Sequence, residues 1–125
     1  MCGTKTMVKI LLVEDDTPLM RLYQGALEVE YDVVAVESSS EAIDALNKFR
    51  PDLVVLDLNL PDAPGTVVLE YIEKHPEFEN LKVVAMTGFA HHRHHNLPPR
   101  VVEMLSKPVT SSMLLRSIKT VSVNH

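Results

Sequence analysis

The sequence predicts an α/β domain in which helices cover both faces of a five-stranded parallel sheet, a doubly wound arrangement. Short runs of branched apolar residues alternate with amphipathic stretches through five cycles, which is typical of parallel strands joined by helices. Because such crossovers are right-handed, the helices are expected on both faces of the sheet. The chain has 125 residues, of which 46% are hydrophobic and 23% charged, and this fits one domain with a buried core.

Five short apolar segments are expected to form the strands. Each is rich in branched side chains and is bounded by polar or turn-forming residues, as buried parallel strands are. They are residues 8–13, 31–36, 53–56, 81–86 and 101–105.

The segments between these strands have the apolar spacing of helices. Thr17 is expected to cap the first helix, with Pro18 at its first position. The second helix is expected to open at Ser40 and to end before Pro51. A third helix follows the next turn, and the last covers about 111–121 with apolar residues on one face.

The stretch between the fourth and fifth strands is expected to hold a short or irregular fourth helix. Prolines end a helix, so a regular one has to fit between Gly88 and Pro98, and Pro98-Pro99 is expected to be an extended lead into the last strand. The histidines in 91–95 raise the hypothesis of a metal site. A polar loop is the simpler interpretation, because no cysteine or carboxylate lies among them.

Charge and cysteine content restrict the class of partner and the compartment. A net charge of −5 disfavours direct binding of nucleic acid, which requires clustered Lys and Arg. Cys2 is the single cysteine, so an intramolecular disulfide is excluded, which fits a reducing compartment. The N-terminus lacks the apolar core of a signal peptide, and no apolar run reaches membrane-spanning length. We therefore expect a cytoplasmic protein that binds neither membranes nor DNA directly.

Polar side chains follow the predicted strands at the edge where doubly wound sheets bind ligands. They are residues 14–16 after the first strand, Asp57 after the third, Thr87 after the fourth and Lys107 after the fifth. Crowded carboxylates repel one another unless a cation lies between them, and Mg²⁺ suits such a site where phosphate is handled. Asp57 is then a candidate nucleophile toward phosphorus. Lys107 would neutralise the phosphoryl oxygens, and Thr87 would donate a hydrogen bond to one of them.

In these residues the chain resembles the response regulator receiver family over nearly its whole length. The resemblance depends on segments 10–16, 52–61 with Gly65, 86–88 and 106–108, in that order. It implies a flavodoxin-like (βα)5 fold with strand order 2-1-3-4-5. The receiver domain would span 8–122 after an N-terminal extension at 1–7.

The resemblance also implies a function in a two-component phosphorelay. Such a domain accepts a phosphoryl group from a histidine kinase or a histidine phosphotransfer domain and changes conformation to signal to a downstream protein. It assists its own Mg²⁺-dependent phosphorylation and dephosphorylation, and is not an enzyme with a separate substrate. By position, Asp57 would be the phosphoacceptor, Thr87 the switch hydroxyl and Lys107 the phosphate partner. The implied Mg²⁺ ligands are Glu14, Asp15, Asp57 and the backbone carbonyl of Asn59. Of the two adjacent acids, Asp15 is the one expected to bind the ion directly.

Other positions carry narrower expectations. The Lys107–Pro108 peptide is of the kind that the family commonly holds cis. Asp16 is expected only to favour the start of a helix by its charge. Met104 stands where the family often has a Tyr or Phe whose rotamer follows the phosphorylation state, so signal output is expected to be unusual. Phe89 stands where the family flanks the path of the hydrolytic water, and it offers no hydrogen bond.

Three other functions are weaker readings of the same residues. A receiver-like binding module that is never phosphorylated would not need the complete set of acids, Thr87 and Lys107. A hydrolase with an Asp nucleophile typically has a second acid two residues later, where this chain has Asn59, and a cap domain that encloses the substrate. A flavin-binding domain is disfavoured because the carboxylates after the first strand would repel a phosphate.

Overall fold

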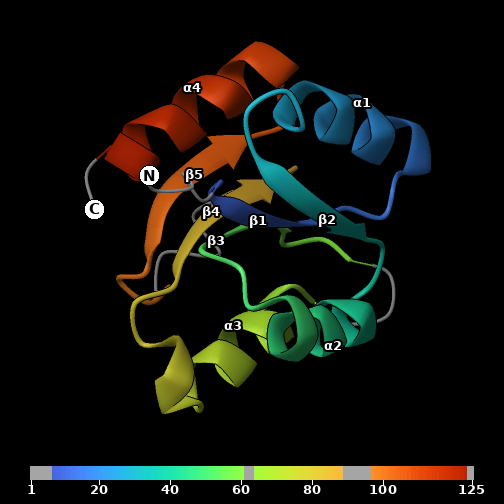
Figure 1. The fold of residues 1–125 in the computed structure, drawn as a ribbon. Helices are drawn as coiled ribbons and strands as arrows, with labels where there is room; N and C mark the ends of the chain where they lie inside the picture. The colour runs from blue at the N-terminus through green and yellow to red at the C-terminus, as the bar shows by residue number, and fades with distance from the viewer. Residues whose placement is uncertain (1–6, 61–63, 89–96, 124–125) are drawn as a thin grey trace, which may run out of the picture.

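Five parallel strands form the centre of the molecule in the order β2-β1-β3-β4-β5, as predicted. The structure is a computed structural model that describes residues 7–60, 64–88 and 97–123 (Figure 1). The strands are β1 (Lys9–Val13), β2 (Asp32–Val36), β3 (Leu53–Asp57), β4 (Lys82–Thr87) and β5 (Val101–Ser106).

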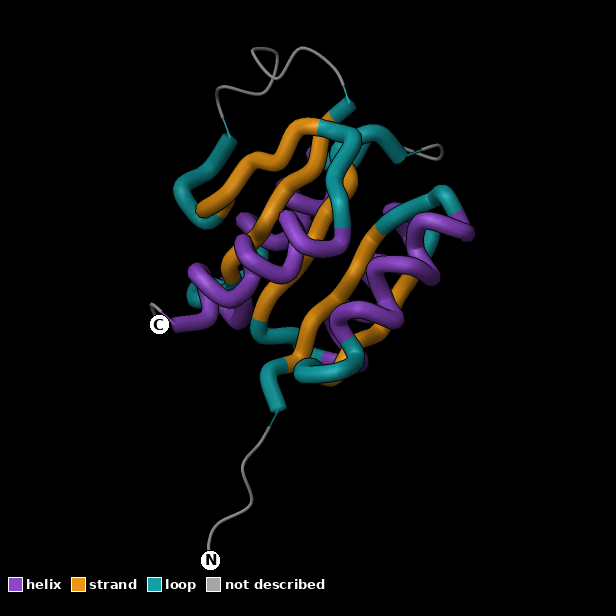
Figure 2. Tube along the Cα trace, turned by 90° about the horizontal axis from the view of Figure 1, so that it is seen from above, coloured by secondary structure: helices purple, strands orange, loops and turns teal. Residues whose placement is uncertain are grey.

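Helices cover both faces of this sheet. Helices α1 (Thr17–Leu27) and α4 (Ser111–Val123) lie on one face, and α2 (Ser39–Phe49) and α3 (Thr66–Glu73) lie on the other (Figure 1). A short 3-10 helix, η1 (Pro76–Phe78), follows α3. Seen from above, helices of one layer cross in front of the strands (Figure 2). The doubly wound prediction is therefore confirmed.

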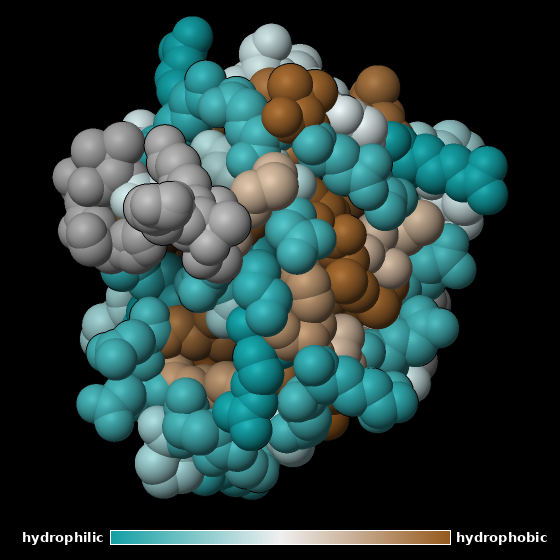
Figure 3. All heavy atoms as spheres, viewed as in Figure 1, coloured by the Kyte–Doolittle hydropathy of each residue, from teal (hydrophilic) through white to brown (hydrophobic). Residues whose placement is uncertain are grey.

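Each face of the sheet has its own apolar core. In β1, Leu11 and Val13 pack toward α2 and α3, while Ile10 and Leu12 pack toward α1 and α4. Both sets are fully buried because successive residues of a strand point to opposite faces, and both faces are covered. Burial becomes partial at the two edge strands, β2 and β5. Figure 3 shows apolar side chains at the surface between the two helical layers.

The start of α1 differs from the prediction. Asp16, not Thr17, is the N-cap residue, and its Oδ1 accepts a hydrogen bond from the backbone N–H of Leu19 at 3.1 Å. Thr17 is already inside the helix, and its hydroxyl donates to Glu37 at 2.6 Å instead. Asp16 thus satisfies a helix N–H directly, in addition to the favourable charge that was expected of it. Helix α2 begins at Ser39, one residue earlier than predicted.

The predicted helix stop before Pro51 is confirmed, because Arg50 ends α2 in the left-handed conformation with φ 54°. The expected extended lead into β5 is wrong. The backbone N–H of Val101 donates to the carbonyl of Pro98 at 3.0 Å, which closes a turn. Pro99 stands at the second position of that turn, where its fixed φ is favourable.

The predicted fourth helix and the 91–95 histidines lie outside the described residues. Among the helices that the structure does describe, none has the length and apolar character needed to cross a bilayer.

Candidate functional site

Three acidic side chains meet at the carboxyl ends of β1 and β3. Glu14 and Asp15 follow β1, Asp57 ends β3, and one carboxylate oxygen of each lies within 4.8 Å of the others. The two strands are parallel neighbours, so residues that follow them lie at the same edge of the sheet. Glu14 and Asp57 are buried, whereas Asp15 is exposed. The structure therefore brings together the acids that the sequence singled out.

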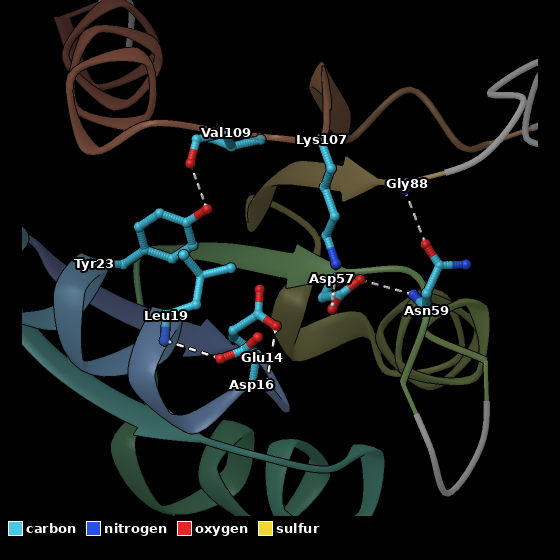
Figure 4. Close-up of polar contacts among 9 residues, drawn as sticks. All are labelled: Glu14, Asp16, Leu19, Tyr23, Asp57, Asn59, Gly88, Lys107 and Val109. Carbon is cyan, nitrogen blue, oxygen red and sulfur yellow. Dashed lines mark hydrogen bonds and ion pairs between the residues drawn. The ribbon is translucent and has the colours of Figure 1, made fainter.

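Lys107 reaches this cluster from the end of β5. Its Nζ donates to Oδ2 of Asp57 at 2.8 Å, and the backbone N–H of Asn59 donates to Oδ1 at 2.9 Å (Figure 4). Burial lowers the pKa of Lys107, but the hydrogen bond and charge of Asp57, with the charges of Glu14 and Asp15, raise it to a larger extent. The net pKa shift is upward, so Lys107 carries its positive charge at neutral pH.

Glu14 has one carboxylate oxygen whose hydrogen-bonding capacity is unused within the described residues. Its Oε2 accepts from the backbone N–H of Asp16 at 3.1 Å, while Oε1 is buried without a hydrogen-bond partner. Burial raises the pKa of Glu14 to about 7. The Asp16 N–H works against this shift, and the charge of Asp57 adds to it. A buried, unpaired carboxylate oxygen beside two further acids suits a hard divalent cation with oxygen ligands, so the donor set fits Mg²⁺.

Hydrogen bonds tie the neighbouring loops to the site. The side-chain Oδ1 of Asn59 accepts from the backbone N–H of Gly88 at 3.1 Å (Figure 4). The backbone N–H of Lys107 donates to the carbonyl of Thr87, which is buried at the end of β4, at 2.8 Å. Thr87 therefore lies next to Lys107, at the carboxyl end of the strand beside β3. The roles of its hydroxyl and of the Asn59 carbonyl stay predictions.

Gly65 is a site residue that the sequence showed only as part of a turn. Its backbone N–H donates to the carbonyl of Leu58 at 3.0 Å, which brings the start of α3 onto the chain that follows Asp57. A Cβ atom at Gly65 would lie 2.6 Å from the backbone oxygen of Asp57 and 2.7 Å from Cα of Leu58. Only glycine permits this close approach.

Tyr23 is a second residue whose part in the site the sequence did not reveal. Its place in the helical spacing of the first helix indicates only a buried ring, yet its hydroxyl donates to the carbonyl of Val109 at 2.6 Å (Figure 4). The signal was present in the residue type, because a buried phenol generally needs a hydrogen-bond partner. Residues from the acidic run, α1, the loop after β3 and the segment after β5 line one pocket: Glu14, Asp15, Asp16, Leu19, Tyr23, Asn59, Lys107, Pro108 and Val109.

Two expectations from the family resemblance concern the β5 end of the sheet. The Lys107–Pro108 peptide is cis, as expected. Met104, within β5, is partly buried and packs against the core formed with α2 and α3. Phe89 lies outside the described residues.

Comparison with known proteins places these features in a family. The model of the response regulator receiver domain matches residues 10–119, a range that contains every candidate site residue. The polar-differentiation response regulator DivK of Brucella anthropi is 30% identical over 82 residues, which are 65% of this chain and 67% of that protein.

Two solved structures illustrate the likeness of fold. A response regulator receiver domain protein (CheY-like) from Methanospirillum hungatei JF-1 has 27% identity and a TM-score of 0.80, covering 92% of this chain and 93% of that one. A receiver domain protein from Clostridium thermocellum has 25% identity and a TM-score of 0.80, covering 91% and 93%.

Proposed function

Because this chain belongs to the response regulator receiver domain family, we propose that it accepts a phosphoryl group on Asp57 in a two-component phosphorelay. The observation that carries the proposal is the environment of the Asp57 carboxylate. It is fully buried at the end of β3, with the Lys107 ammonium 2.8 Å away and two further acids beside it. The Asp57 carboxylate can act as the nucleophile toward phosphorus, and the Lys107 ammonium beside it can offset the negative charge of the phosphoryl oxygens.

The acids also supply a site for Mg²⁺. Receiver domains generally bind this ion at an acidic pocket. In this chain Glu14, Asp15, Asp57 and the carbonyl of Asn59 would hold it, and the unpaired Oε1 of Glu14 supports the assignment. When bound, Mg²⁺ supplies positive charge that offsets the negative charge of the phosphoryl oxygens.

The donor is a phosphohistidine of a histidine kinase or of a histidine phosphotransfer domain. A lone pair of the Asp57 carboxylate attacks phosphorus, the P–N bond breaks, and its electron pair stays on the donor's imidazole nitrogen, which takes up a proton. Lys107 attracts the transferring phosphoryl oxygens, and the Thr87 hydroxyl donates to one of them once the group is on Asp57. The chain turns over no separate substrate, so it acts as a phosphoacceptor that assists its own reaction.

The proposal extends to where the chain acts and what it contacts. We place it in the cytoplasm, where its phosphorylated form signals to a downstream protein. Its net charge of −5 disfavours direct contact with nucleic acid.

Mass spectrometry after treatment with Mg²⁺ and acetyl phosphate tests the phosphoacceptor. Wild type should gain one phosphoryl group, and Asp57→Asn should gain none, because an amide is a poor nucleophile. Asp32→Asn is the matched control and should leave labelling unchanged. Asp32 is an exposed aspartate at the amino end of β2, whereas the site lies at the carboxyl ends of the strands. Undiminished labelling of Asp57→Asn would show that another residue is the acceptor.

A further inference from the structure

A buried tyrosine hydroxyl joins α1 to the segment that carries Lys107. Tyr23 is fully buried in α1, and its hydroxyl donates to the Val109 carbonyl, 86 residues further along the chain, at 2.6 Å. Val109 is two residues after Lys107 and one of the residues that line the pocket around the acids. The phenol ring fills core space that a Phe would fill equally well, so the hydroxyl has a role distinct from apolar packing.

The segment between β5 and α4 is held from both sides. On the β4 side, the Lys107 backbone N–H donates to the Thr87 carbonyl at 2.8 Å. On the α1 side, the Tyr23 hydroxyl holds the carbonyl of Val109. Between these two attachments the Lys107 side chain extends to Asp57, with 25% of its side-chain surface exposed. A flexible lysine stem does not fix its ammonium by itself, so the position of Nζ depends on how firmly its backbone is held.

Helix α1 is itself tied to the acids. It starts directly after the acidic run, and Asp16, whose backbone N–H donates to Glu14, also caps it. Helix α1 therefore follows the acids at the end of β1 directly, and the Tyr23 hydroxyl joins this helix to the segment that carries Lys107. This hydrogen bond is a link between the two sides of the site in addition to the sheet, and both sides would contact the phosphoryl group in the proposed reaction.

We propose that Tyr23 is a positioning residue for phosphoryl transfer, which holds the Lys107 segment in register with the acids through its hydrogen bond to Val109. The inference rests on the proposed function, since it assigns Tyr23 a part in the reaction at Asp57. Loss of the hydroxyl should slow phosphorylation without removing the Mg²⁺ ligands.

The experiment compares Tyr23→Phe with Tyr31→Phe, both under conditions in which circular dichroism shows the protein folded. Tyr31 is a matched control because it is a buried tyrosine of the same apolar core at the amino end of β2, away from the site. At saturating Mg²⁺ and acetyl phosphate, Tyr23→Phe should be labelled roughly threefold to tenfold more slowly than wild type, because catalysis depends steeply on position. Its Kd for Mg²⁺ should stay within about twofold of wild type, since the oxygen ligands are unchanged. Tyr31→Phe should match wild type in both.

A double-mutant cycle separates positioning from a general loss of stability. If Tyr23 acts through Lys107, Tyr23→Phe should have no further effect on the residual rate in a Lys107→Ala background. Tyr23→Leu, which also lacks the hydroxyl, gives a second test should the Phe variant fold poorly.

The outcomes distinguish the inference from the proposed function. A wild-type protein that takes no phosphoryl group would refute the proposed function. A labelled wild type with equal rates for Tyr23→Phe and Tyr31→Phe would overturn the inference alone. So would an undiminished effect of Tyr23→Phe in the Lys107→Ala background.

Discussion

Replacing Gly65 by alanine tests whether the close approach of α3 to the Asp57 strand is a real constraint on this fold. A Cβ atom at Gly65 would meet the backbone oxygen of Asp57 at 2.6 Å and Cα of Leu58 at 2.7 Å. Both contacts are to backbone, so no side chain can rotate away, and the start of α3 would have to move off β3. Gly25 offers the matched control, because it is exposed in α1 and an added Cβ there has no neighbour within 4 Å.

The two substitutions should change the free energy of unfolding in opposite directions. Overpacking at Gly65 should cost about 1–3 kcal/mol of the free energy of unfolding. Alanine is also a poorer N-cap than glycine, which adds about 0.5 kcal/mol at this position, the N-cap of α3. Gly25→Ala should instead stabilise the protein by about 0.5–1 kcal/mol, because alanine is the better residue within a helix. The two variants should therefore differ by about 2–4.5 kcal/mol.

Urea unfolding followed by circular dichroism measures this difference, with wild type in the same series. The midpoint should fall for Gly65→Ala and rise for Gly25→Ala, with similar dependence on urea concentration. If Gly65→Ala were as stable as wild type, the close backbone approach would not exist in solution, and the placement of the Asp57 carbonyl against α3 would be wrong.

Three further predictions concern metal, pH and the lifetime of the phosphoryl group. Mg²⁺ at ten times its Kd should stabilise wild type by about 1.4 kcal/mol in thermal unfolding. Asp15→Ala should lose this stabilisation, while the control Asp16→Ala should keep it. If Asp15→Ala were stabilised as wild type is, Asp15 would be excluded as a ligand. Burial raises the pKa of Tyr23 from 10.0 to about 12, so above pH 10 the unfolded chain releases a proton that the folded state keeps, and stability falls as pH rises. Tyr23→Phe should therefore lose roughly 1 kcal/mol less stability than wild type between about pH 9 and 11 in urea unfolding, and equal losses would contradict the pKa shift. Phe89→Glu should speed loss of the phosphoryl group, because a carboxylate can hydrogen-bond a water that Phe89 cannot, and an unchanged or slower decay by mass spectrometry would count against that expectation.

The sequence by itself determined the sheet and the acidic end of the site. Strand order and the meeting of Glu14, Asp15 and Asp57 followed from the alternation of elements, the family resemblance and the rule that parallel strands end at one edge. These features depend on patterns that recur along the chain or on motifs directly after a strand. They are local in sequence, so no knowledge of packing was needed to find them.

Tertiary structure decided the contacts between segments that are distant along the chain. Whether Asp16 or Thr17 caps α1 depended on where Glu37 lies, because its carboxylate engages the Thr17 hydroxyl. The partner of the Tyr23 hydroxyl depended on how α1 packs beside the start of α4. Apolar periodicity shows that a residue is buried, but it does not show which polar atom of a distant segment will lie next to that residue. A hydrogen bond needs the two atoms within about 3 Å of each other, and their separation is fixed only when the helices pack.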